Sequence, residues 1–303
     1  ALGAGAWSAA IFHFLVHAFF KALLFLCAGA IMLATQHERD MFKMGGLRGQ
    51  LPLIFWTFLI GSASLSAIPF VTAGFYSKEA ILRGVWASHL GLAWLGVVGL
   101  TGAFLTSLYS FRMVFLVFFG PAKSEARLKP SFHVWFPLLI LAGLTLGCGF
   151  LEIPRSPGGI SIFSGFLAAA SPVHRPRLQS EFLLPVMTSF LSLGGIFAAY
   201  LFFLRLPHLS LSLVQTAAGG LLKRFWFSGW GFEWFYHLVF LRPFLWFTRI
   251  NKNDFFDLLS RAPARVSVLS HEALRETQSG NVRWYGAVFV LGAVIMVAVA
   301  VFL

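Results

Sequence analysis

Long apolar runs alternate with short polar segments along most of the chain, a pattern typical of an integral membrane protein. A run of about 20 apolar residues is long enough to cross a bilayer as one helix. The pattern therefore predicts an all-α membrane protein with about six spanning helices. We expect these spans at residues 7–35, 52–86, 91–119, 132–151, 181–204 and 282–303.

The second of these spans is expected to be discontinuous. Pro69 removes a backbone donor and disfavours the helical turn before it, and Gly74 adds conformational freedom a few residues later. We therefore predict that the helix breaks between these two residues and resumes near Ser77. Because freed backbone groups in a bilayer must be satisfied by protein or water, helices broken in this way mark substrate and ion sites in transporters.

The composition agrees with the apolar pattern, since 58% of the residues are hydrophobic and 11% are charged. A soluble domain has about 25% charged residues. The net charge of +12 lies mainly in loops and in a region near the C-terminus, which favours a positive-inside topology over nucleic-acid binding. We expect the loops 36–51 and 120–131 and the region 205–281 on the cytoplasmic side.

Three basic residues inside the first span share one face of the predicted helix. His13, His17 and Lys21 are spaced four residues apart, which places them on one narrow stripe. A charge in the hydrocarbon region is costly unless it faces protein or water, so we favour a proton relay for these groups. The alternative is structural, with neutral histidines hydrogen-bonded between helices and a paired lysine.

Lys78 and Glu79 are the other ionisable pair inside an apolar stretch, directly after the predicted break. They could store or gate a proton. Alternatively, the span ends early and both side chains reach the membrane surface. Apolar residues continue after the pair, which favours the functional interpretation. Arg83 is expected nearer the membrane surface.

The region 205–281 mixes basic residues with many Trp and Phe residues, which is typical of a segment lying in the membrane interface. From about Glu233 the pattern is broadly helical, with an interruption at Pro243. An interfacial anchor and a long helix along neighbouring subunits both fit this pattern. The predicted regions are thus a transmembrane half-channel at 1–204, an amphipathic lateral helix at 205–281 and a final span at 282–303.

No motif for a nucleotide or metal site and no catalytic redox centre occurs in the sequence. The cysteines, Cys27 and Cys148, lie in apolar spans without metal-ligand spacing, so we expect them to be small core residues. The chain opens a few residues before a span, with neither an initiator Met nor a basic signal-peptide region. We expect it to be the later part of a longer polypeptide.

Two motifs resemble the antiporter-like membrane subunits of respiratory complex I, the proton-translocating NADH:quinone oxidoreductase. Residues 13–26 read His-Phe-Leu-Val-His-Ala-Phe-Phe-Lys-Ala-Leu-Leu-Phe-Leu. Residues 74–79 read Gly-Phe-Tyr-Ser-Lys-Glu and are similar to the second broken helix of that family. Within that family, the segment containing Glu233, His237 and Pro243 resembles the start of the long lateral helix.

The resemblance extends along the whole chain but covers only the second half of the family's length. It implies that His13, His17 and Lys21 form the central relay. It also implies that Lys78 is the outlet-side lysine and that Glu79 is its acidic neighbour.

The resemblance further implies a proton-translocating subunit in a bacterial inner membrane that binds no cofactor itself. FMN, iron–sulfur clusters and quinone would belong to partner subunits. The implied partners are neighbouring antiporter-like subunits, other membrane and peripheral subunits of the complex, and lipid. Two alternatives stay open: a subunit of a standalone sodium/proton antiporter of the same superfamily, and a purely structural membrane subunit.

Overall fold

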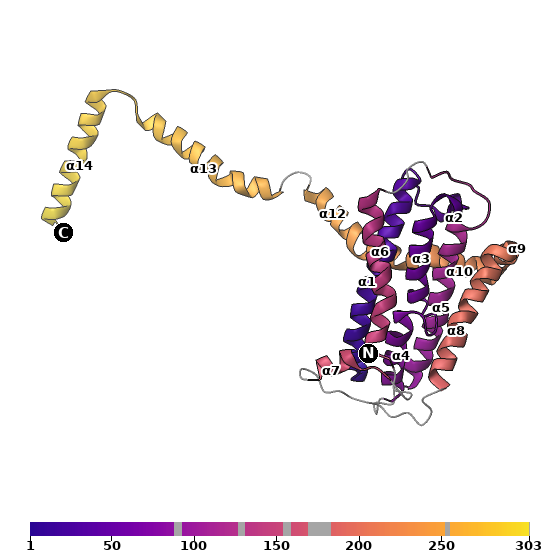
Figure 1. Cartoon of the computed structure of the whole chain (residues 1–303). Coiled ribbons are helices and arrows are strands. Elements are labelled where there is room, and N and C mark those ends of the chain that lie inside the picture. The colour runs from indigo at the N-terminus through magenta and orange to yellow at the C-terminus, as the bar shows by residue number, and fades with distance from the viewer. Residues whose placement is uncertain (88–92, 127–130, 154–158, 169–182, 252–254, 303) are drawn as a thin grey trace. The chain divides into compact units, whose positions relative to one another are not determined.

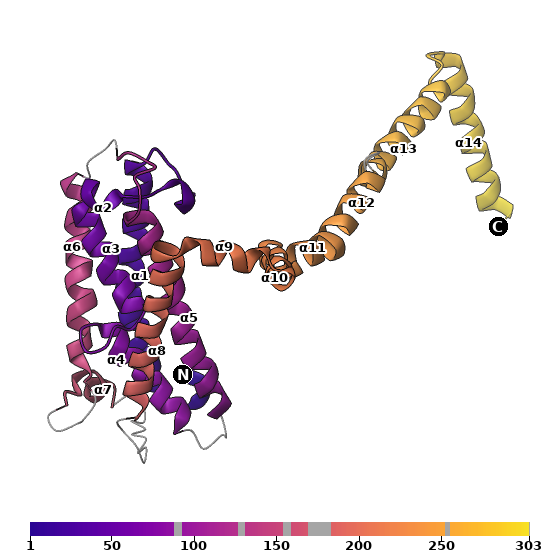
Figure 2. The same ribbon diagram turned by 90° about the vertical axis from the view of Figure 1, so that its right-hand side faces the viewer.

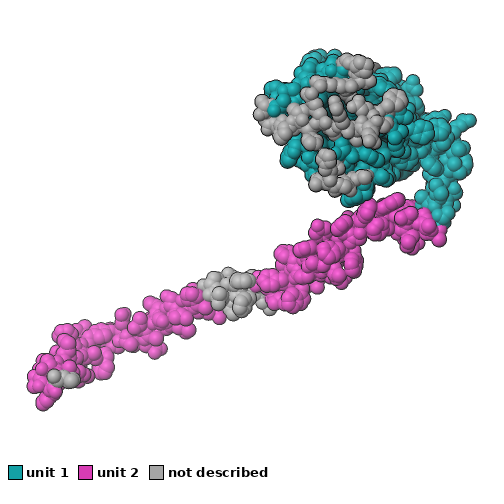
Figure 3. Space-filling view, turned by 90° about the horizontal axis from the view of Figure 1, so that it is seen from below, with its two compact units in different colours: residues 1–216 teal, residues 217–303 magenta. Residues whose placement is uncertain are grey.

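The chain folds almost entirely into helices. The computed structural model describes residues 1–87, 93–126, 131–153, 159–168, 183–251 and 255–302, and every regular element within these ranges is a helix. Contacts divide the chain into two units, residues 1–216 and 217–303, which Figure 3 colours separately. The first unit extends beyond residue 204 because the short helix α9 (Pro207–Gln215) packs on the π-helical turn Leu201–Arg205.

The first unit is a bundle of apolar helices that lie side by side in Figure 1 and Figure 2. Helix α1 packs against α3, α4 and α6, and α5 packs against α8. The long elements are α1 (Trp7–Ala34), α3 (Pro52–Leu65), α4 (Ala73–Trp86), α5 (Ala93–Phe118), α6 (Phe132–Gly147) and α8 (Leu183–Tyr200). The short ones are η1 (Leu2–Ala4), η2 (Met41–Lys43), α2 (Leu47–Gln50), η3 (Cys148–Leu151) and α7 (Ile162–Leu167).

Among the described helices, five are long and apolar enough to cross a membrane, and α3 is a shorter apolar helix. This confirms the prediction of an all-α membrane protein. The interrupted span made by α3 and α4 accounts for the remaining one of the six predicted spans. The five long segments are Trp7–Ala34, Trp94–Phe118, Phe132–Leu151, Leu183–Arg205 and Val282–Phe302.

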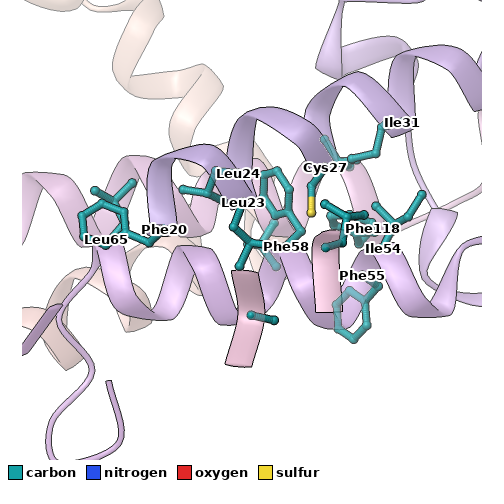
Figure 4. Close-up of a cluster of buried hydrophobic side chains, with 14 of the residues drawn as sticks. Phe20, Leu23, Leu24, Cys27, Ile31, Ile54, Phe55, Phe58, Leu65 and Phe118 are labelled. Carbon is teal, nitrogen blue, oxygen red and sulfur yellow. The ribbon is translucent and has the colours of Figure 1, made fainter. Parts of the chain in front are cut away.

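Close packing of large side chains holds the bundle together (Figure 4). Phe20 and Leu23 of α1 are fully buried, and Phe58 of α3 lies against Phe118 of α5 with ring centroids 5.4 Å apart. Gly61 of α3 lets Leu24 approach closely, since a Cβ on that glycine would come within 2.9 Å of the leucine side chain. Because lipid tails are as apolar as these side chains, such interdigitation, rather than burial alone, stabilises helix association in a bilayer.

Residues 66–72, which we call the break, leave helical geometry between α3 and α4. Two non-glycine residues of the break, Ala67 and Phe70, have positive φ angles of 58° and 64°. Each left-handed residue of this kind costs on the order of 1–3 kcal/mol and persists only where its surroundings hold it. The contacts that hold the break are therefore central to the fold.

The expected limits of the break were partly wrong. Pro69 lies inside it, but helix α4 resumes at Ala73, four residues before Ser77. Gly74 thus belongs to the first turn of α4, and its role is close approach rather than flexibility. A Cβ at Gly74 would overlap the carbonyl oxygen of Ser64, and its N–H donates to the Ser64 hydroxyl at 3.1 Å.

The second unit is a succession of helices whose described side chains are mostly exposed. The predicted interruption at Pro243 was wrong, because the helical backbone continues from Phe232 to Ile250. A π-helical turn, His237–Leu241, precedes the proline and accommodates its missing N–H. The elements are α10 (Ala217–Phe227), η5 (Gly229–Gly231), α11 (Phe232–Tyr236), α12 (Arg242–Ile250), α13 (Phe255–Thr277) and α14 (Val282–Phe302).

Replacing Gly74 with alanine should destabilise the break, because the new Cβ would overlap the Ser64 carbonyl oxygen. Overpacking of this kind costs about 1–3 kcal/mol, so we expect a lower thermal midpoint of the assembled protein in detergent. Gly143→Ala in α6 is the matched control, since a Cβ there meets no atom within 4 Å. Equal midpoints for the two variants would show that α3 and α4 do not pack this closely.

Candidate functional site

Side chains satisfy the backbone groups that the break frees inside the bundle. The Lys78 ammonium donates to the carbonyl oxygen of Leu65, the last residue of α3. The buried Ser107 hydroxyl of α5 donates to the Ser66 carbonyl at 3.2 Å. The Thr72 hydroxyl donates to the carbonyl four residues before it at 2.8 Å. Lys78 is therefore anchored at the negative end of a half-helix, where a cation is favoured.

The three basic residues of α1 lie along one stripe, next to the stripe that α1 buries in the core. His13, His17 and Lys21 are all partly buried. The rings of the two histidines have their centroids 5.9 Å apart. The ring of His17 also meets the edge of Phe20, with centroids 5.1 Å apart. The stripe predicted from the spacing thus lies beside the packed core.

A hydrogen bond connects this stripe to the helix that follows the break. Nδ1 of His13 lies 3.1 Å from the hydroxyl oxygen of Ser77, a fully buried residue of α4. Ser77 directly precedes Lys78, so this hydrogen bond lies one residue from the lysine that reaches the Leu65 carbonyl. The structure therefore brings the predicted α1 relay and the predicted α4 lysine together.

Glu79 pairs with an arginine of its own helix. Its carboxylate forms an ion pair with Arg83, one helical turn later, and the two side chains are 3% and 17% exposed. The buried carboxylate holds the Arg83 guanidinium, and the expectation that Arg83 lies nearer the membrane surface stays a prediction. The spacing of four residues between opposite charges was the sequence signal for this pair. Within the described residues, Lys78 forms no ion pair.

The contacts that Ser77 and Ser107 make between helices are what sequence reasoning missed. A serine within a span commonly bonds its own helix, so nothing in the sequence distinguished these two from the other hydroxyls. Their roles depend on contacts between helices that are far apart in the sequence.

The remaining predicted residues lie outside this site. Glu233 is in the first turn of α11, His237 begins the π-helical turn, and Pro243 is in the first turn of α12. Both cysteines are free and buried, and the thiol of Cys27 lies 3.3 Å from the Thr57 hydroxyl. These buried positions agree with the prediction that Cys27 and Cys148 are small core residues.

Comparison with known proteins bears on the same region. Residues 1–106, which contain every predicted relay residue, match the family model described as "NADH:quinone oxidoreductase/Mrp antiporter, TM". The chain is 40% identical over 299 residues to NADH-quinone oxidoreductase subunit L of Escherichia coli (strain K12), covering 98% of this chain and 47% of the relative. The chain belongs to the NADH:quinone oxidoreductase/Mrp antiporter membrane family.

Other family members show the same relationship. The subunit L of Pseudomonas aeruginosa is 40% identical over 98% of this chain and 46% of its own length. NADH-ubiquinone oxidoreductase chain 5 of Phytophthora infestans is 37% identical over 75% of this chain and 36% of its own length. The chain thus spans about half the length of its bacterial relatives. The resemblance to the antiporter-like complex I subunits is confirmed.

Replacing Arg83 with methionine should leave the buried Glu79 carboxylate without a partner. Removing one member of a buried ion pair costs about 3–5 kcal/mol, so we expect a strongly reduced thermal midpoint of the assembled protein. Adding Glu79→Gln removes the unpaired charge and should restore most of the loss.

Lys43→Met is the control for this pair of variants. It removes an exposed ion pair with Glu38, in which Lys43 is 68% exposed, and such pairs contribute about 1 kcal/mol at most. A single Arg83 variant as stable as the Lys43 variant, or no recovery in the double variant, would contradict the buried pair.

Proposed function

We propose that this chain is part of a proton-translocating membrane subunit of a bacterial NADH:quinone oxidoreductase in the inner membrane. The observation that carries the proposal is the junction of two ionisable sets in the family-matching region. His13, on the stripe with His17 and Lys21, is hydrogen-bonded to the residue that precedes Lys78.

The residues of this junction suit proton transfer. Imidazole exchanges protons near neutral pH, and the two histidine rings are one helical turn apart. The partner of the Lys78 ammonium is a neutral carbonyl rather than a carboxylate. A proton can therefore leave Lys78 without the rupture of an ion pair, whereas Glu79 is held by Arg83.

Water completes the proposed route between these side chains. Ser62 and Ser66 of the interrupted span and Ser110 of α5 have buried hydroxyls with no partner among the described residues. Buried polar groups of this kind are where proteins hold internal water. Protons would move from the α1 stripe to Lys78 and then leave to the outer side.

Energy would reach the relay from other subunits as an electrostatic or conformational change. A shift of one pKa unit corresponds to about 1.4 kcal/mol, so a moderate change in the local field suffices to move a proton between Lys21 and Lys78. The chain itself would carry out no redox chemistry. FMN, iron–sulfur clusters and quinone would reside in partner subunits, and neighbouring antiporter-like subunits would contact this one.

A subunit of a standalone sodium/proton antiporter is the second candidate, because the matching family model also covers Mrp antiporters. Such a protein would keep the buried lysines but couple proton movement to a sodium gradient. Sodium-dependent proton flux in the absence of NADH would favour it. The subunit L and chain 5 relatives support the redox-driven pump.

Replacing Lys21 or Lys78 with methionine should lower the number of protons pumped per NADH oxidised, because each variant removes a proton-carrying group from the relay. The measurement uses inverted membrane vesicles that contain the full-length subunit in its complex. Lys123→Met is the control, since Lys123 is exposed and, among the described residues, its ammonium donates only to the Phe42 carbonyl. We expect its pumping to match that of the wild type.

The amount of assembled complex must be measured in the same membranes. Wild-type pumping in both lysine variants would contradict the proposal. A loss of assembly that fully accounts for the loss of pumping would support a purely structural role instead.

A further inference from the structure

The hydroxyl of Ser77 lies between two groups that compete for its single proton. Its oxygen is 3.1 Å from Nδ1 of His13 on α1 and 3.3 Å from the carbonyl oxygen of Gly74 on its own helix. Ser77 has no exposed surface. A hydroxyl donates one hydrogen bond and accepts others, whereas a carbonyl oxygen only accepts.

Other hydroxyls of this bundle donate their proton within their own helix. Thr101 and Thr106 of α5 each donate to the carbonyl four residues earlier, at 3.0 and 2.6 Å. Donation to a carbonyl of the preceding turn is the usual arrangement for a hydroxyl within a helix. If Ser77 donates to Gly74 in the same manner, its oxygen is left to accept, and His13 must supply the N–H.

We propose that Ser77 is a positioning residue of the relay, which holds His13 in the tautomer that carries its proton on Nδ1. Nε2 of His13 is then the atom that takes up and releases the transferred proton. This inference rests on the proposed function and assigns a role to a residue outside the ionisable set.

The arrangement keeps the ring fixed through a full transfer cycle. When Nε2 gains a proton, the N–H on Nδ1 still donates to Ser77, so neither side chain has to turn. The bond also ties the ring to the helix that carries Lys78, the residue next to Ser77 in sequence. The orientation of a proton carrier on α1 is thereby set by α4.

Three variants of the full-length subunit in its complex test this role. Ser77→Ala should pump about two- to tenfold fewer protons per NADH, the size expected from the loss of one hydrogen bond. Ser77→Thr keeps the hydroxyl and should restore most of the pumping. Ser64→Ala removes a buried hydroxyl whose one hydrogen bond within the described part of the chain is from the Gly74 N–H. This last variant should lower the thermal midpoint but leave the ratio of protons to NADH unchanged.

An assembled Ser77→Ala complex that pumps at the wild-type ratio would overturn the inference. So would an equal pumping loss in Ser64→Ala, because the effect would then come from packing at the break. If the alanine variant does not assemble, Ser77→Cys provides the test instead. A thiol forms weaker hydrogen bonds than a hydroxyl, so this variant should give an intermediate ratio of protons pumped to NADH oxidised. A wild-type ratio for the cysteine variant overturns the inference as well.

Failure of this inference is distinguishable from failure of the proposed function. If Lys21→Met and Lys78→Met lose pumping while Ser77→Ala does not, only the role of Ser77 is wrong. If the lysine variants pump normally, the proposed function itself is wrong.

Discussion

An interrupted helix inside a membrane-spanning bundle must satisfy its free backbone groups without help from bulk water. In this chain the break at residues 66–72 places that demand between α3 and α4. The Lys78 ammonium donates a hydrogen bond to the free Leu65 carbonyl, and the Ser107 hydroxyl donates one to the Ser66 carbonyl. The same lysine is the α4 member of the proposed relay, so the residue that stabilises the break is also the one proposed to carry a proton.

The surrounding structure follows from this constraint. Gly74 lets α4 begin against the end of α3, which fixes the helix that carries Ser77 and Lys78. Arg83 holds Glu79 in an ion pair one turn further along that helix. Lys78 is consequently left to a neutral carbonyl and forms no ion pair among the described residues. In the proposed mechanism, structural charge and transferable charge therefore reside on separate residues.

Much of this could be read from the sequence, because spans and buried charges leave local patterns. Apolar runs predict the spanning helices, and the four-residue spacing of His13, His17 and Lys21 predicts the α1 stripe. Contacts across the break could not be read in the same way. Gly74 resembles a flexible hinge until Ser64 is seen against it. Pro243 is a residue type that usually ends a helix, yet the helical backbone continues through it because a π-helical turn directly precedes α12. Tertiary contacts override local preference at these positions.

Native purification tests the central claim, a subunit of a redox-driven proton pump, most directly. The full-length subunit would be tagged, extracted from its own membranes in mild detergent and assayed for NADH-dependent quinone reduction. We expect the subunit to migrate with flavin- and iron–sulfur-containing subunits in a particle that oxidises NADH. Migration with hydrophobic antiporter subunits alone, with sodium-dependent proton flux and no NADH oxidation, would contradict a redox-driven pump.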